Sequence, residues 1–123
     1  MANREFTVAE ARALLPRVLE QADEFVQVRA DLSQLAYELQ TAGSSALGGV
    51  AEAKAFEARL DDVASWFNDR GIEVKGVAPL LLDFPAHLDG RSVRLCWLEG
   101  DVELAWYHLS ELGFAGRRPL PDA

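Results

Sequence analysis

The sequence predicts an α+β fold: a long antiparallel helical hairpin with a three-stranded antiparallel β-meander, in a single domain over residues 1–123. Two observations predict it. In the first half of the chain, apolar residues repeat at alternating spacings of three and four, the period of packed helices. In the second half, apolar and polar residues alternate between two glycine-containing turns, the period of strands. We expect residues 6–70 to form the helical part, and residues 71–123 the meander and a C-terminal tail.

The N-terminal residues predict a helix that begins after Thr7. Thr7 is a preferred N-cap residue, and Glu10, three positions later, completes a capping box. Pro16 then interrupts the pattern, because proline has no backbone N–H and disfavours the α conformation in the residue before it. We therefore expect a kink or break near residues 14–15, with Pro16 in the first turn of the next helix.

From residue 16 to about residue 41 the sequence predicts one long helix. A helix of about 26 residues rises about 39 Å, which is longer than a small core can cover. We therefore expect part of it to project or to meet another subunit. Arg29 interrupts the apolar seam; its side chain either reaches solvent along the apolar surface or acts as a buried charge that sets pairing specificity. The seam consists of Leu15, Val18, Ala22, Phe25, Arg29, Leu32, Ala36 and Leu39.

Residues 42–49 are small and flexible and predict the loop of the helical hairpin. A second helix is predicted from about Val50 to Arg70, with Gly71 as the residue that ends it. Residues 72–75 are compatible with a further short strand. After His108, repeated glycine and proline argue against any regular element. The apolar positions of the second helix are Ala53, Phe56, Leu60, Val63, Trp66 and Phe67.

The two turns, Asp89-Gly90 and Glu99-Gly100, predict the alignment of the three strands. Each places a glycine where a two-residue type I′ turn needs positive φ. Centring the hairpins on these turns places Trp97 opposite Leu82 on one side and opposite Val102 on the other. All the apolar residues then share one face, which the helices must cover. This face consists of Leu82, Phe84, Ala86, Val93, Leu95, Trp97, Val102, Leu104 and Trp106.

On the opposite, polar face the same alignment forms a row of Asp83, Cys96 and Glu103. Neighbours in such a row have Cβ atoms about 4.5–5.5 Å apart. Two carboxylates that flank a thiol could hold a divalent metal ion or could raise the pKa of the thiol. Arg94 lies diagonal to both acids, so the alternative is an ordinary polar face in which Arg94 pairs with them.

The two histidines are predicted on opposite faces of the sheet. His108 follows Trp106 onto the apolar face, half-buried and hydrogen-bonded to the backbone, whereas His87 faces solvent beside the first turn. Neighbouring sheet positions therefore cannot assemble a His-rich zinc site. Possible ligand contacts on the sheet are Arg94, Tyr107 and His108.

In the tail, the segment 113–118 could bind an anion through its backbone N–H groups, Arg117 and Arg118. The alternative is that these arginines pair with acidic helices of the same chain or of a partner. No nucleophile elbow, P-loop or dinucleotide-binding motif occurs, so the sequence identifies no catalytic residue, cofactor or reaction.

Composition restricts the class of protein. The chain of 123 residues has a formal net charge of −8 and no basic run, so we expect no binding to nucleic acid or to anionic membranes. It has one cysteine, which fits a reducing cytoplasm, and neither an apolar run of membrane-spanning length nor a signal-peptide pattern at its N-terminus.

Three stretches carry a resemblance: FTVAEARALLP, VKGVAPLLLDFPAHLDGRSVRLCWLEGDVELAWYH and GFAGRRPL. Together they resemble the prokaryotic family catalogued as domain of unknown function 2203. The family pattern favours a glycine before its LxDFP segment and a Gly-Glu turn before an adjacent Trp-His pair. Here Pro79-Leu80 and Gly100-Asp101 occupy those places, and Tyr107 separates Trp106 from His108. The resemblance implies no activity.

These patterns support two hypotheses of function. The first is a non-catalytic interaction or scaffold module, a homodimer that self-associates through its long helices, because the helical seam extends beyond what the sheet can cover. The second is a protein that binds a metal ion or small ligand on the polar sheet face around Asp83, Cys96 and Glu103.

Overall fold

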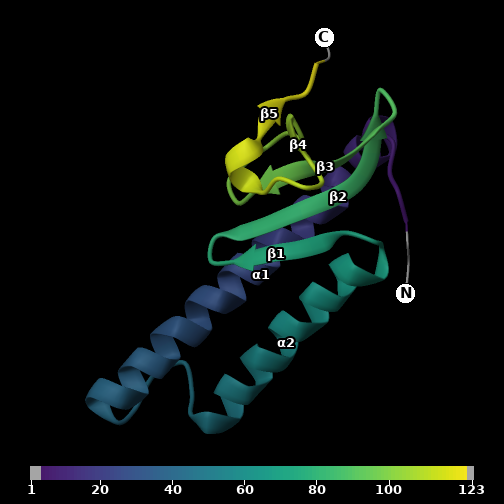
Figure 1. The fold of residues 1–123 in the computed structure, drawn as a ribbon. Coiled ribbons are helices and arrows are strands. Elements are labelled where there is room, and N and C mark those ends of the chain that lie inside the picture. Colours follow the sequence, from purple (N-terminus) through teal and green to yellow (C-terminus); the bar gives the residue numbers. More distant parts are fainter. Residues whose placement is uncertain (1–3, 122–123) are drawn as a thin grey trace.

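The computed structural model describes residues 4–121, in which two helices pack against a five-stranded antiparallel sheet (Figure 1). The strands are ordered along the sheet as they are in the chain, so every neighbouring pair is antiparallel and no connection crosses the sheet. The predicted α+β class and antiparallel sheet are confirmed, but the sheet has five strands rather than three. The elements are α1 (Val8–Ala42), α2 (Val50–Asp69), β1 (Glu73–Val77), β2 (Leu80–Leu88), β3 (Arg91–Leu98), β4 (Trp106–Leu109), the 3₁₀ turn η1 (Phe114–Gly116) and β5 (Arg118–Pro119).

Helix α1 begins with the predicted capping box. The Thr7 N–H donates to the Glu10 carboxylate at 2.9 Å, and the Glu10 N–H donates to the Thr7 hydroxyl at 3.0 Å. The predicted break at residues 14–15 is wrong, because α1 continues through Pro16 to Ala42. Pro16 is exposed, whereas Leu15 and Val18 are buried in the core on either side of it. Packing on the sheet thus holds both segments in one helix.

Both helices end at left-handed glycines. Gly43 has φ +76° after α1, and Gly71 has φ +82° after α2. Beyond α2, the Ile72 N–H donates to the Phe67 carbonyl and the Gly71 N–H to the Asn68 carbonyl, each at 3.0 Å. These two bonds form a Schellman motif, which confirms the predicted helix end.

The helices form an antiparallel hairpin that extends past the sheet (Figure 1). Near the sheet, the first half of the α1 seam is buried, from Leu15 to Phe25. In the projecting half, the only buried residue of α1 is Leu35, which the predicted seam did not include, and Ala36 is exposed. The partly buried apolar residues of this half include Leu32, Leu39, Ala53 and Phe56, whereas Leu60 of α2 packs against the core.

The hairpin of β2 and β3 has the predicted alignment. Asp89 (φ +51°) and Gly90 (φ +78°) both have the positive φ of a type I′ turn. Phe84 lies opposite Leu95, and Leu82 lies opposite Trp97. All four side chains are at most 2% exposed.

The predicted pairing after the second turn is wrong. The turn itself forms, because the Asp101 N–H donates to the Leu98 carbonyl at 2.8 Å. The chain then leaves the sheet, and β4 pairs Trp106 with Cys96, where the sequence had placed Glu103. This three-residue shift reverses the faces of β4, since successive strand residues point to opposite sides. Val102, predicted in the core, is 79% exposed.

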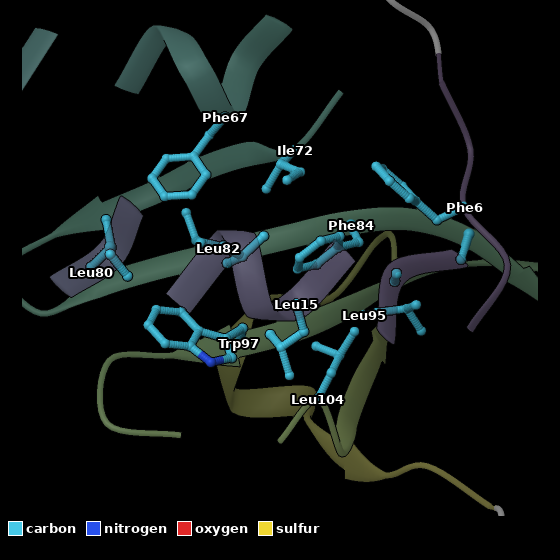
Figure 2. Close-up of a cluster of buried hydrophobic side chains, with 14 of the residues drawn as sticks. Phe6, Leu15, Phe67, Ile72, Leu80, Leu82, Phe84, Leu95, Trp97 and Leu104 are labelled. Carbon is cyan, nitrogen blue, oxygen red and sulfur yellow. The ribbon is translucent and has the colours of Figure 1, made fainter. Parts of the chain in front are cut away.

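The core lies between the helices and the sheet (Figure 2). All of its predicted strand residues in β2 and β3 are buried, and Leu104 is buried from the loop before β4. Phe6 packs edge to face on Phe84, with ring centroids 5.3 Å apart. The labelled members in Figure 2 are Phe6, Leu15, Phe67, Ile72, Leu80, Leu82, Phe84, Leu95, Trp97 and Leu104.

The two additional strands extend the sheet at its edges. The short strand considered for residues 72–75 forms as β1 over Glu73–Val77 and pairs with β2. The tail, predicted without regular elements, instead forms η1 and β5, and β5 pairs with β4. The Leu120 N–H donates to the Ala105 carbonyl at 2.8 Å, which fastens the end of the tail to the loop before β4.

Candidate functional site

Three ionisable side chains meet on the sheet face opposite the helices: Asp83 of β2, Cys96 of β3 and His108 of β4. Asp83 and Cys96 are direct partners across the strands. His108 reaches over β3, with its Nε2 atom 3.2 Å from Asp83 Oδ2. The three residues are 3%, 0% and 4% exposed, so this outer cluster is as buried as the core on the other face.

The hydrogen bonds of His108 fix how many protons the histidine–aspartate pair holds. Its Nδ1 atom is 2.8 Å from the Leu109 carbonyl, which can only accept, so Nδ1 carries a proton. A second proton lies between Nε2 and Asp83, on either atom. Both placements leave the pair without net charge, which is the state that a buried site favours.

Burial raises the pKa of both acidic groups of the outer cluster. It raises the pKa of Asp83, although the nearby His108 lowers it in part. It raises the pKa of the Cys96 thiol to about 12, and the Asp83 carboxylate beside it adds to the shift. The thiol is therefore protonated at neutral pH, and a protonated thiol is a poor nucleophile. Asp83 Oδ1 is buried and accepts no hydrogen bond of normal geometry from the described residues, although the Cys96 thiol beside Asp83 is a weak donor.

The C-terminal tail supplies part of the cover of this face. The guanidinium of Arg117 lies over the Trp106 ring, 4.5 Å from its centroid, and over the Phe114 ring at 4.2 Å. The positive charge of Arg117 also opposes the rise in the Cys96 pKa, so the Arg117 guanidinium lies near the thiol. In Figure 1 the yellow tail lies in front of the sheet and α1 runs behind it.

The predicted row of Asp83, Cys96 and Glu103 does not form. Glu103 is exposed and lies in the loop before β4. Within residues 4–121, no three His, Cys, Asp or Glu side chains are grouped as metal ligands. The prediction of opposite faces for the histidines is also wrong, because the observed pairing of β3 with β4 puts His108 on the same face as His87. His87 is exposed, as predicted, and lies 2.9 Å from Glu5.

Arg94 has other partners than the predicted acids. Its guanidinium binds the Glu73 carboxylate of β1 at 2.9 Å and the Ser110 hydroxyl at 2.8 Å. The partner of Asp83 is instead His108. Sequence reasoning missed Glu73 because it had not committed to a fourth strand beside β2.

The remaining predicted contacts are spread over the tail and the end of the sheet. Tyr107 is half-buried against the helix-side core rather than in the outer cluster. Arg118 is exposed, whereas Arg117 is half-buried in its contact with the two aromatic rings.

An apolar groove of about 370 Å³ lies beside the outer cluster. Leu81 and Leu98 are partners across β2 and β3, and they lie one step along the same face from Asp83 and Cys96. The groove is lined by Gly76, Val77, Ala78, Pro79, Leu81, Leu98 and Phe114.

Arg29, the charged interruption in the α1 seam, ties the helix to the far end of the sheet. Its guanidinium binds both oxygens of Glu99, at 2.7 and 2.8 Å, and donates to the Val77 carbonyl at 2.6 Å. Glu99 also accepts from the Leu80 N–H at 2.8 Å. Arg29 and this N–H lower the pKa of Glu99 to about 2. The lone charge in an apolar seam was a signal for a charged partner, but the sequence did not identify which one.

Comparison with known proteins identifies a family but no characterised relative. The family described as "Uncharacterized conserved protein (DUF2203)" matches residues 4–120. No curated protein and no solved structure matches the chain. Within residues 4–121, no helix combines the length and the apolar character needed to cross a bilayer.

Proposed function

The chain belongs to this uncharacterised family, DUF2203, and we propose that it is a non-catalytic interaction module that self-associates through the projecting half of its helical hairpin. The observation that carries the proposal is the incomplete burial of that half. Beyond the sheet, Leu35 is buried, but Phe56 of α2 and Leu39 of α1 are only partly covered.

A second hairpin would complete this packing. Two helices alone bury one stripe each, whereas four helices enclose a core. Large apolar side chains also lie on the outside of the projecting half, where Tyr37 is 66% exposed and Val50 is 71% exposed. Exposed apolar residues of this kind favour a partner surface of the same shape.

The chemistry of the outer cluster supports a non-catalytic role. Cys96 is the chain's single cysteine, and its thiol is protonated because its pKa is raised to about 12. The histidine that could act as its base binds Asp83 and a backbone carbonyl instead. This arrangement lacks the nucleophile–base contact that nucleophilic catalysis requires.

Sedimentation equilibrium of the full chain tests the proposal. The natural sequence should be a dimer at about 50 µM. A concentration is specified because self-association depends on it. Tyr37→Glu should shift the protein to a monomer by placing a charge in the interface. Val102→Glu, at an exposed valine in the loop before β4, is the matched control and should remain a dimer. A monomer of natural sequence at that concentration would contradict the proposal.

A further inference from the structure

The apolar groove and the outer cluster lie next to each other, and the tail borders both. We propose that residues 110–120, which we call the strap, close a small-molecule site on the outer face of the sheet. The site takes a largely apolar molecule that carries a hydrogen-bond donor. This inference is independent of self-association through the helices.

The register of the sheet places the groove beside the cluster on the same face. The pair Leu81–Leu98 lines the groove, and the next pair on the same face is Asp83–Cys96. Phe114, another residue of the groove lining, belongs to the strap. If Phe114 moves, the groove extends toward the cluster. The combined site has many apolar residues and a few polar groups, the usual composition of small-molecule pockets.

The chemistry of the ligand follows from Asp83. Its Oδ2 atom is engaged by His108, but Oδ1 is buried and accepts no hydrogen bond of normal geometry. The Cys96 thiol beside Asp83 is only a weak donor, so a ligand N–H or O–H that reaches Oδ1 forms a stronger hydrogen bond. An ionised ligand carboxylate has no proton to donate and would form no hydrogen bond with Oδ1. The apolar groove accommodates the rest of the molecule.

The strap is held by few buried contacts. Leu120 is its one buried residue, whereas Leu112 and Phe114 are 48% and 40% exposed. Its strand β5 has two residues. Segments with few buried apolar contacts open at lower free energy than the core. Cys96 is fully buried on this face, and because it is the chain's single cysteine, its labelling reports when the face opens.

Titration of the full chain with hexylamine, followed by backbone amide NMR, tests the ligand chemistry. Hexylamine should shift the amide signals of residues 81–83 and 96–98 saturably, and hexanoate should not. Asp83→Asn should weaken hexylamine binding about tenfold, the effect of one charge-assisted hydrogen bond. Asp89→Asn, at an exposed turn, is the matched control and should bind as the natural sequence does. Equal binding of the amine and the carboxylate would overturn the proposal. This comparison uses the natural sequence, so it does not depend on the folding of any variant.

Labelling of Cys96 with dithiodipyridine tests the strap. Phe114→Ala should accelerate labelling about tenfold, because it removes one ring of the contact with Arg117, while the far-UV circular dichroism stays unchanged. Labelling of the natural sequence should also be faster than global unfolding measured in the same buffer. If Cys96 reacts only at the rate of global unfolding, or if Phe114→Ala leaves the rate unchanged, the strap does not open as a unit and the proposal fails.

Discussion

The two turns on either side of β3 have similar sequences and different outcomes. Asp89-Gly90 has positive φ at both positions and joins two aligned strands. At Glu99-Gly100 only Gly100 has positive φ, +100°, which is the pattern of a type II turn. Type I′ turns match the right-handed twist of paired strands, whereas type II turns splay them. A glycine in the second turn position therefore predicts a turn, but the first position decides whether a hairpin follows.

Contacts from elsewhere hold the second turn in its form. The Glu99 carboxylate accepts hydrogen bonds from the Arg29 guanidinium of α1. Asp101 accepts the Leu98 N–H on its carboxylate at 3.0 Å and the Trp97 indole N–H on its carbonyl at 2.9 Å. The Leu98 N–H and the Asp101 carbonyl are therefore engaged elsewhere. A strand that continued directly after the turn would have needed these two groups for backbone pairing.

The largest expected effect separates the observed pairing from the predicted one. Leu95→Ala and Leu104→Ala should each lower the free energy of unfolding by about 2–5 kcal/mol, because both side chains are at most 1% exposed. Val102→Ala should change it by less than about 0.5 kcal/mol, since Val102 is exposed. Urea denaturation measures all three. A large loss of unfolding free energy for Val102→Ala would instead support the pairing that the sequence predicted.

Glu99→Gln should have the next largest effect. It removes the charge that binds Arg29, and we expect a loss of about 1–3 kcal/mol at neutral pH. The lowered pKa of Glu99 means that its stabilising contribution is present above the unfolded pKa, near 4.5, and is lost as the pH falls toward about 2. Urea midpoints across this range should fall more steeply for the natural sequence than for Glu99→Gln.

The matched control for Glu99→Gln is Glu57→Gln, which alters an exposed pair with Lys54, 3.6 Å long. It should change stability by less than about 0.5 kcal/mol. Equal effects of the two variants would mean that the tie between α1 and the second turn contributes nothing specific.

Substitution of either turn glycine by alanine should lower the stability by a similar amount. Gly90→Ala and Gly100→Ala each force an L-residue into positive φ, at a cost of about 1 kcal/mol. Neither added Cβ would meet another atom within 4 Å, so no clash adds to this cost. Thermal unfolding compares the two variants. A much larger loss at Gly100 would show that the second turn also controls the pairing of β4.

The smallest effect is expected at Asp83, and its pH dependence runs opposite to that of Glu99. Burial raises the pKa of Asp83, so its favourable contribution is present below the unfolded pKa, near 3.8, and is lost as the pH rises through the folded value. Asp83→Asn does not titrate and keeps an acceptor for His108. It should therefore gain stability relative to the natural sequence as the pH rises from about 4 to 7. A difference in urea midpoint between the variant and the natural sequence that stays constant or falls over this range would contradict the assignment.

The sequence alone determined the features whose physical cause lies within a few residues. The capping box at Thr7, the end of α2 at Gly71 and the alignment of β2 with β3 through Asp89-Gly90 are all local. Side-chain alternation on β2 and β3 then placed Trp97 in the core and Cys96 on the opposite face, as observed. The outer cluster was predicted in part, because two of its members lie on these strands.

The tertiary structure decided what depends on contacts between distant segments. Packing on the sheet keeps α1 continuous through Pro16, and the tail adds a fifth strand. Arg29 and Glu99, which bind each other, are 70 positions apart, and Asp83 and His108 are 25 apart. The residues next to each of these side chains do not indicate its partner. The partner depends on which folded elements come together and compete for the same charged and hydrogen-bonding groups. The pairing of β4, and with it the buried histidine, therefore follows from the packed molecule.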